Sequence, residues 1–500
     1  MRLIIRRSRE VRGTVRREEN APMITLSRFR FTAADLLGVV MCLLAIEPTR
    51  VASQSQASPE HVTAGQITDV TCSSDATESY ALYLPPAYSA AKRWPIIYFF
   101  DPLARGRRPL ELYKDLAQTY GFILAGSNNS RNFSSDQAKA VNAIWQDTHE
   151  SLSIDEHRSY ASGFSGGARV AGAMALSGTA GQIAAVIAHG AGYPSNRSAA
   201  KNELPYFFAV GNQDFNWPEV ISIRREREEQ SLPYCVVVYP GRHQWAPASV
   251  MESAFRYLNL KAMQAGNMAQ DASFIDQLFD RAKSEADDAV KRDDPISQLS
   301  AYRSLVADFA GLRDVKEFAA KLAALQQSPT LKKALRIERE QISEQARLEQ
   351  EISPKIESLA GGSVADVATL RIEIRHQLAG LSDQAKHSKN EQNRLISARA
   401  FAGIFARTIE DGQRELVARH FEKAETYFDL MREVTDDPWP ALLLAQTHAI
   451  SGSRKLAIKD LQEAVRRGLK DRTILESDPQ LQSLKNDPEF QKLLAGMETK

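Results

Sequence analysis

Residues 159–167 read SYASGFSGG, and this stretch decides how the middle of the chain is interpreted. Ser159–Gly163 is typical of a buried strand, and Gly167–Leu176 is typical of a helix. A serine set between glycines at a strand–helix junction, G-x-S-x-G, predicts a sharp turn that needs close backbone approach. Such a turn would place Ser165 above the end of a sheet, at a helix N-terminus whose dipole favours negative charge.

Strands and helices alternate on both sides of this turn, from about residue 60 to residue 265. Helical patterns separate several of the apolar runs. This alternation predicts a largely parallel α/β sheet flanked by helices, with strands buried on both faces. Besides Ser159–Gly163, runs typical of strands occur at Tyr80–Leu84, Ile96–Phe100, Phe122–Ala125, Ala184–Ala188, Tyr206–Val210 and Cys235–Tyr239.

Two titratable side chains follow later strands at the same kind of position as Ser165. Asp214 comes after Tyr206–Val210, and His243 comes after Cys235–Tyr239. The carboxyl ends of parallel strands meet at one edge of a sheet, so we expect these three side chains to lie together. A serine becomes a nucleophile near pH 7 when a histidine takes its proton and an acid orients that histidine. Asp214 could instead belong to an Asx-type turn.

A tetrahedral oxyanion needs two N–H donors. The Gly166 amide, directly after the serine, is the first candidate, and the Leu103 amide is the second because Pro102 has no N–H. Asp101 and Arg105 could instead pair and shape that loop. Four further side chains are candidates for the substrate pocket, although side chains of these kinds are more often buried structural residues: Phe164, His189, Trp217 and Trp245.

At these residues the sequence resembles the α/β-hydrolase superfamily. It is most similar to the exported esterase branch with polyhydroxyalkanoate-depolymerase-like and feruloyl-esterase-like members. The resemblance covers about residues 65–262 and rests on YALYLP, GFSGG, the Gly211–Asp214 turn and GRHQW. It implies Ser165 as nucleophile, Asp214 as orienting acid and His243 as base. Asp101-Pro102 departs from the family's His-Gly, which affects the second oxyanion donor.

The rest of the chain is predicted to be helical, so the expected fold class is an α/β-hydrolase sheet domain followed by an all-α region. Residues 266–398 read as a helical linker domain, in which Asp294-Pro295 is a helix N-cap followed by Pro. Residues 399–500 read as a tetratricopeptide-like domain, because Ala424, Phe428 and Met431 recur as Ala457, Leu461 and Ala464. Such repeats could dock a protein partner, or could form a helical hairpin without a binding groove.

The composition is that of an ordinary globular protein, with 500 residues and a net charge of +1. Residues 1–53 hold ten Lys/Arg and five Asp/Glu. The uncharged run Leu36–Ile46 is 11 residues, too short to span a bilayer, which takes about 20. We expect residues 1–57 to be a signal peptide, with Met23 as an alternative start, and residues 58–265 to form the catalytic domain. The mature protein would be periplasmic or secreted, without a stable membrane span, and Cys72 and Cys235 could pair or stay free.

These patterns favour a serine hydrolase that cleaves a carboxylic ester from a small molecule or a polymer. A serine peptidase with the same three residues is the first alternative. A non-catalytic binding or scaffold protein that uses its helical repeats is the second. The sequence has no metal-ligand spacing, no phosphate-binding loop and no dinucleotide fingerprint, so we expect no metal and no cofactor. The near-neutral charge gives no reason to expect a nucleic-acid partner.

Overall fold

The structure is a computed structural model, and it describes residues 62–132, 134–177, 183–194, 203–362, 366–476 and 478–497. The predicted signal peptide, residues 1–57, lies outside the described residues. Within the described part of the chain, every helix is too short or too polar to cross a bilayer.

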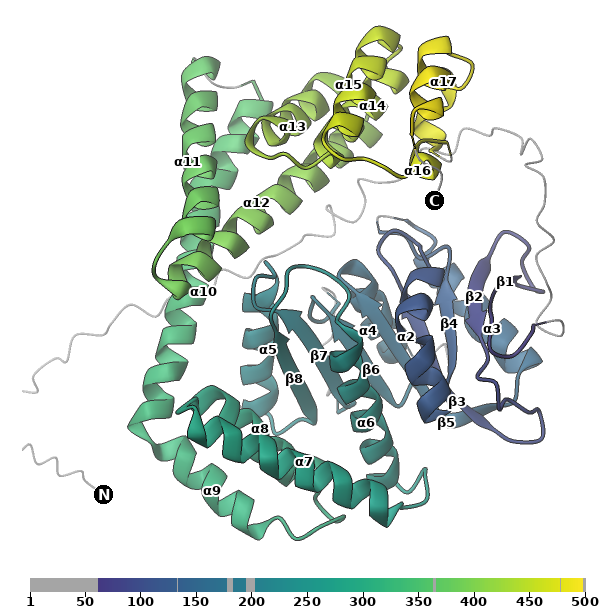
Figure 1. The fold of residues 1–500 in the computed structure, drawn as a ribbon, viewed down its shortest axis with the longest axis vertical. Coiled ribbons are helices and arrows are strands. Elements are labelled where there is room, and N and C mark those ends of the chain that lie inside the picture. Colours follow the sequence, from purple (N-terminus) through teal and green to yellow (C-terminus); the bar gives the residue numbers. More distant parts are fainter. Residues whose placement is uncertain are drawn as a thin grey trace, which may run out of the picture. The chain divides into compact units, whose positions relative to one another are not determined.

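The first half of the described chain folds around an eight-stranded sheet (Figure 1). Its strands follow the order β1-β2-β4-β3-β5-β6-β7-β8. The first two strands run antiparallel to their neighbours, and β4 through β8 are joined by parallel pairings. The strands are β1 (Ile67–Thr71), β2 (Ser79–Tyr83), β3 (Trp94–Phe100), β4 (Ile123–Ser127), β5 (Ile154–Phe164), β6 (Ala185–His189), β7 (Tyr206–Gly211) and β8 (Tyr234–Tyr239).

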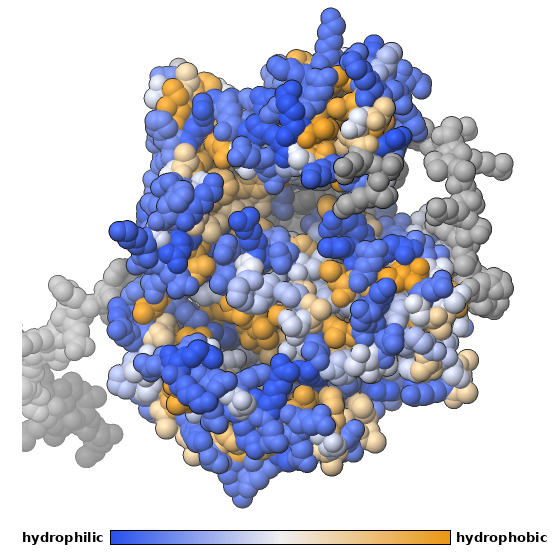
Figure 2. All heavy atoms as spheres, viewed as in Figure 1, coloured by the Kyte–Doolittle hydropathy of each residue, from blue (hydrophilic) through white to orange (hydrophobic). Residues whose placement is uncertain are grey.

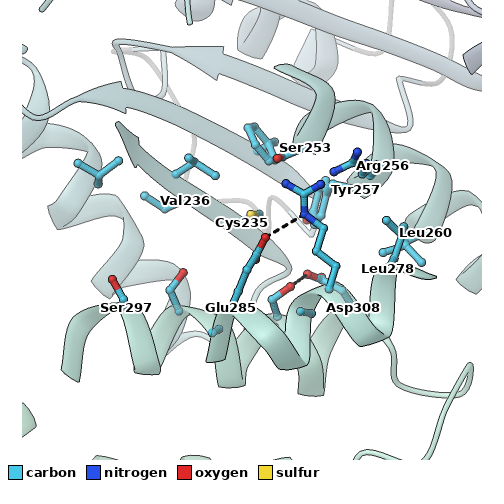
Figure 3. Close-up of a pocket in the computed structure, with 18 of the residues that line it drawn as sticks. Cys235, Val236, Ser253, Arg256, Tyr257, Leu260, Leu278, Glu285, Ser297 and Asp308 are labelled. Carbon is cyan, nitrogen blue, oxygen red and sulfur yellow. Dashed lines mark hydrogen bonds and ion pairs between the residues drawn. The ribbon is translucent and has the colours of Figure 1, made fainter. Parts of the chain in front are cut away.

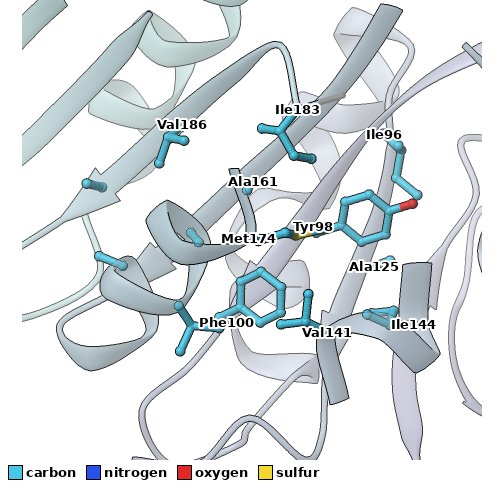
Figure 4. Packing of buried hydrophobic residues seen from close by; sticks show 14 of the residues in the cluster. Ile96, Tyr98, Phe100, Ala125, Val141, Ile144, Ala161, Met174, Ile183 and Val186 are labelled. Carbon is cyan, nitrogen blue, oxygen red and sulfur yellow. The ribbon is translucent and has the colours of Figure 1, made fainter. Parts of the chain in front are cut away.

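Helices cover both faces of this sheet, because parallel strands need crossover connections that pack back onto it. One face packs against α3, α4 and α5, and the other packs against α2 and α6. Figure 4 shows part of the first core, where Tyr98 and Phe100 meet Met174 and Val141. The five helices are α2 (Arg107–Tyr120), α3 (Gln137–Ser151), α4 (Gly166–Ser177), α5 (Trp217–Glu229) and α6 (Ala248–Gln264).

The remaining elements are helical, so the predicted fold class is confirmed. In the view of Figure 2, hydrophilic residues cover most of the surface over α7, α8 and α9. The elements are α7 (Ala272–Lys291), α8 (Pro295–Asp308), α9 (Lys316–Gln327), α10 (Pro329–Ala360), α11 (Val367–His387), α12 (Glu391–Val417), α13 (Phe421–Val434), α14 (Trp439–Ile450), α15 (Arg454–Arg466), α16 (Arg472–Glu476), the 3-10 turn η2 (Pro479–Leu484) and α17 (Pro488–Ala495).

Helix α10 runs through Pro354 and ends at Ala360, because Ile352, Ile356 and Leu359 are buried in one apolar cluster on both sides of the proline. That packing outweighs the backbone hydrogen bond that a proline removes. The predicted domain boundary after residue 398 falls inside the continuous helix α12. The expected N-cap is confirmed, since Asp294 accepts from the backbone N–H of Ile296 and Ser297.

The positions that define the weak sequence repeat are buried. Ala424, Phe428 and Met431 lie in one apolar cluster, and Ala457, Leu461 and Ala464 lie in the next. The repeat therefore marks the packed faces of α13 and α15. Assignment to the tetratricopeptide class stays a prediction.

Cys72 and Cys235 are both free thiols, and burial raises the pKa of each. Cys72 directly follows β1 and Cys235 lies in β8, so the two residues stand at opposite edges of the sheet. Adjacent strands are spaced by about 4.8 Å, whereas the Cα atoms of a disulfide lie within about 7 Å. This topology rules out a disulfide between them within one folded chain.

Candidate active site

Ser165 stands at the junction between β5 and α4 in a left-handed backbone conformation, with φ of 54°. Non-glycine residues rarely take this conformation, and it persists where the surroundings impose it. The glycines around it are required by contact. A Cβ on Gly163 would lie 2.1 Å from the Gly167 carbonyl oxygen, and one on Gly167 would lie 2.0 Å from the Phe100 carbonyl oxygen. The strained turn predicted from G-x-S-x-G is therefore present.

The structure brings the three predicted catalytic side chains together. His243 Nε2 lies 2.9 Å from Ser165 Oγ. On its other side, His243 Nδ1 lies 2.9 Å from Asp214 Oδ1 and 3.0 Å from Oδ2. The His243 imidazole can accept the serine proton, and the Asp214 carboxylate lies behind it. This arrangement activates a serine for acyl transfer.

The loops that carry the acid and the histidine are hydrogen-bonded to each other. The backbone N–H of Asn212 donates to Tyr239 O, and that of Gln213 donates to Gly241 O. The Gly241 N–H donates in return to Asn212 Oδ1 over 3.2 Å. These bonds continue the β7–β8 pairing beyond the strand ends, so the sheet contributes to the spacing between Asp214 and His243.

Asp214 and His243 differ in how far their side chains are buried. Asp214 has no exposed surface, and its Oδ1 also accepts from the Asn216 N–H over 2.8 Å. The His243 side chain keeps 21% of its surface exposed. Its ring lies between two phenylalanine rings, with centroids 4.5 Å from Phe164 and 4.3 Å from Phe215. A fully buried acid thus lies behind an imidazole that is largely covered but still partly accessible.

The two predicted oxyanion donors, the backbone N–H groups of Gly166 and Leu103, differ in their hydrogen bonding. Gly166 is the first residue of α4, so its N–H has no acceptor within that helix. The Leu103 N–H already donates to Asp101 Oδ1 over 2.9 Å, and the Ala104 N–H donates to the Asp101 carbonyl over 2.9 Å. The geometry therefore contradicts Leu103 as a free donor, because Asp101 captures the amide in an Asx-type turn.

Asp101 organises the whole loop after β3. Its buried carboxylate accepts from Arg105 Nε and Nη2, and from Trp245 Nε1 over 2.9 Å. The structure shows the alternative in which Asp101 pairs with Arg105 and shapes the loop. Asp101 thus holds the loop through its side chain.

Sequence reasoning missed Asn132, which lies in the loop after β4. Its carboxamide packs against the turn at Ser165, since a Cβ on Gly166 would lie 1.9 Å from Asn132 Oδ1 and 2.6 Å from Nδ2. The Asn132 backbone N–H donates to Pro102 O over 2.8 Å, which ties this loop to the loop after β3. Rotation of the carboxamide about its terminal bond exchanges its two ends, so it can present an N–H beside Gly166. The only signal in the sequence was a polar loop after a predicted strand.

The other predicted pocket residues are mainly structural. His189 is fully buried, lies 3.3 Å from Ser162 Oγ through Nε2, and has its pKa lowered to about 3 by burial. Trp245 packs on His189 with ring centroids 5.0 Å apart. Trp217 is 6% exposed and lies under the guanidinium of Arg399 from α12. Of the four, Phe164 alone packs against the ring of His243.

A separate cavity of about 410 Å³ lies between β8, α6, α7 and α8 (Figure 3). Its lining mixes apolar side chains with ion-paired and hydrogen-bonded groups, such as Arg281 with Glu285 and Ser304 with Asp308. The cavity is not lined by Ser165, Asp214 or His243. It is therefore distinct from the candidate active site.

No protein-family model matches the sequence, and no curated protein matches it. Several solved structures resemble the sheet domain. A fluorophosphonate-binding serine hydrolase of Staphylococcus aureus is 13% identical over 36% of this chain and 92% of its own, with a TM-score of 0.30. A ferulic acid esterase is 15% identical over 39% of this chain and 97% of its own, with a TM-score of 0.32.

Esterase 2 of Thermogutta terrifontis is 13% identical, covering 42% of this chain and 99% of its own, with a TM-score of 0.32. These neighbours are serine hydrolases and esterases. At such identities a likeness concerns the fold, so the assignment of the site rests on its own geometry: the strained serine, the imidazole and the buried carboxylate.

Proposed function

We propose that this chain is an exported serine hydrolase that cleaves a carboxylic ester through an acyl-enzyme. The observation that carries the proposal is the continuous contact from Ser165 Oγ through His243 to Asp214, built on a backbone strained at the serine. Backbone strain at a polar residue beside titratable groups is typical of a functional position. A non-catalytic scaffold would not require a strained serine hydrogen-bonded to a histidine and a buried carboxylate.

In the first half of the reaction, His243 Nε2 takes the Ser165 proton while Oγ bonds to the ester carbonyl carbon. The carbonyl oxygen becomes an oxyanion, which the Gly166 N–H and the N-terminal end of α4 stabilise. The protonated imidazole then gives its proton to the departing alkoxide, and the C–O bond breaks. Asp214 accepts from Nδ1–H throughout, which selects the tautomer with a free Nε2 lone pair.

In the second half, water replaces the alcohol beside His243. The imidazole takes one proton from the water as its oxygen bonds to the acyl carbon. The second tetrahedral intermediate collapses, the acid leaves, and Ser165 recovers its proton. The same groups thus act twice, and the balance requires only the ester and one water.

The test is covalent labelling of the full chain by a fluorophosphonate probe, with Ser165→Ala and His243→Ala as controls. We expect labelling of the parent protein, its loss in Ser165→Ala and strong slowing in His243→Ala. A folded parent that resists the probe would contradict the proposal. Matched ester and amide substrates of the same acyl group then separate an esterase from a peptidase, and we expect ester cleavage to dominate because alkoxides leave more readily than amines.

Export is part of the proposal and rests on the short apolar run near the N-terminus. Cell fractionation with N-terminal sequencing of the mature protein tests it directly. We expect a processed protein that begins near residue 54 or 58 in the periplasm or medium. Recovery of the unprocessed chain in the cytoplasm would contradict export and leave the hydrolase proposal intact.

A further inference from the structure

The helical region contacts the loop that carries the candidate acid. We call residues Gly211–Trp217 the acid loop. The Asn212 carbonyl, two residues before Asp214, accepts from Arg399 Nη1 over 3.0 Å. The Phe215 carbonyl, one residue after Asp214, accepts from Gln345 Nε2 over 3.0 Å. Backbone carbonyls on both sides of the acid are therefore bound by side chains of α12 and α10.

Three hydrogen bonds and one aromatic ring hold the Arg399 guanidinium in this position. Arg399 is 1% exposed and donates from Nε to Gln345 Oε1 over 3.0 Å and from Nη2 to Gln341 Oε1 over 2.9 Å. Its charge lies 4.1 Å from the centroid of the Trp217 ring, which ends the acid loop. Burial lowers the pKa of Arg399 to about 10. Burying a cation among neutral oxygens destabilises the folded protein unless the cation makes its hydrogen bonds. Loss of these bonds would therefore disturb the position of the Arg399 side chain and of the loop that it binds.

The same face of α12 continues toward the imidazole. Gly403 lies one turn after Arg399, and a Cβ on Gly403 would touch the Phe215 Cβ at 3.4 Å. The Phe215 ring in turn packs on His243. Helix α12 therefore supports the acid loop at the Asn212 carbonyl and at the Cβ of Phe215, whose ring covers the base, and α10 binds the Phe215 carbonyl.

We propose that α10 and α12 fix the position of Asp214, and that Arg399 and Gln345 are positioning residues for the hydrolase. Neither side chain touches substrate or the reacting atoms; each acts through the acid loop. This inference rests on the proposed function, and it assigns the helical region a role within the same catalytic site. It also gives a reason for the contacts that α10 and α12 make with the sheet domain.

The test compares Arg399→Met with the parent protein in the full chain. Methionine keeps an unbranched stem over Trp217 and removes the three hydrogen bonds. We expect kcat for a neutral ester to fall by about 10- to 100-fold with little change in KM, since a displacement of about 1 Å at a catalytic group has effects of that size. Arg399→Lys keeps the charge and one hydrogen bond, so we expect it to recover part of the rate.

A second readout separates positioning from general loss of structure. A loosened Asp214 stabilises the imidazolium less, so the acidic limb of the kcat/KM profile moves to lower pH in Arg399→Met. Gln345→Met is a second variant, which removes the bond to Phe215 O together with the bonds to Arg399 Nε and Glu349 Oε1, and we expect the same direction of shift. Thermal unfolding and circular dichroism establish that each variant is folded at the assay temperature.

Glu338→Gln is the matched control. Glu338 of α10 pairs with Arg224 of α5, with Nη2 and Oε2 2.5 Å apart, so the variant weakens another contact between α10 and the sheet domain without touching the acid loop. We expect its kcat and pH profile to match the parent. Folded Arg399→Met and Gln345→Met proteins with parental kcat and pH profile would overturn the inference. A parent that neither binds the fluorophosphonate probe nor cleaves esters would instead contradict the proposed function.

Discussion

Gly190 and Asp214 approach so closely that only glycine fits. Gly190 follows β6 with φ of 58°, and a Cβ there would lie 2.7 Å from Asp214 Oδ2 and 3.2 Å from His243 Nδ1. The Gly190 carbonyl also accepts from Asn216 Nδ2 over 2.8 Å. The strand between the serine and the acid in the sheet thus contributes backbone to the wall behind the imidazole.

Gly190→Ala is expected to lower kcat by about 10- to 100-fold, because the new methyl group displaces the carboxylate from Nδ1. The positive φ costs a residue with a Cβ about 1–2 kcal/mol, which lowers the free energy of unfolding. Gly266→Ala is the control: Gly266 has φ of 73°, and a Cβ there would have no neighbouring atom within 4 Å. Chemical denaturation should show a loss of stability in both variants, larger in Gly190→Ala because the clash adds to the backbone cost, and steady-state kinetics should show a loss of activity in Gly190→Ala alone.

Asp214→Asn tests the orienting role of the acid. Asparagine is close in size and can still accept from the Asn216 N–H, so we expect a folded protein. Its amide can present an N–H to Nδ1, which favours the tautomer that lacks a free Nε2 lone pair. We expect kcat to fall by about 10³- to 10⁴-fold. Asp69→Asn, at the surface ion pair with Arg107, should retain parental kcat; equal activity of both variants would exclude the assigned role.

Asn132→Ala tests the carboxamide beside Gly166. If Asn132 supplies the second oxyanion donor, its removal should lower kcat by about 10²-fold with little change in KM, since the bond strengthens in the transition state. Asn129→Ala is the control in the same loop, because the Asn129 side chain faces the other way, toward the backbone of Ser79 and Thr77. We expect Asn129→Ala to lose stability and keep its rate. Unchanged kcat in Asn132→Ala would remove this residue from the oxyanion site.

The sheet and the three central side chains were accessible to sequence reasoning for a physical reason. Each of Ser165, Asp214 and His243 lies at or shortly after the end of an apolar strand, and parallel strands bring their carboxyl ends to one edge. Local sequence therefore reports on their proximity. The strain at Ser165 was accessible as well, because two close glycines signal backbone contact.

Contacts made by distant segments were not accessible in this way. Arg399 and Gln345 lie more than 100 residues beyond the acid loop, on helices whose exposed faces carry many similar polar residues. Trp217, predicted to line the pocket, is instead covered by Arg399. Leu103 is a different case: an aspartate two residues earlier commonly accepts the amide in an Asx turn, so the sequence held a signal against a free Leu103 N–H.

The last prediction concerns the helical region and pH. His448 of α14 is buried against Asp460 of α15, with Nδ1 and Oδ2 2.7 Å apart, and Glu425 lies 3.3 Å from Nε2. Arg432 faces the same carboxylate, 3.4 Å from Asp460 Oδ1. The hydrogen bond to Asp460 is the main reason that the pKa of His448 is raised above its ordinary value of 6.5, against the opposing effect of burial.

A raised pKa means that the folded state holds the proton more tightly than the unfolded chain does. The stabilisation is therefore complete below about pH 6.5 and is lost as pH rises through the folded pKa. We expect the melting temperature of His448→Gln to lie about 2 °C or more below that of the parent at pH 6, and this difference to shrink by pH 9. His387→Gln, at an exposed histidine paired with Asp383, controls for loss of a surface imidazole. A difference between parent and His448→Gln that is independent of pH would show that His448 contributes packing alone, because only the protonated ring gains from the carboxylates around it.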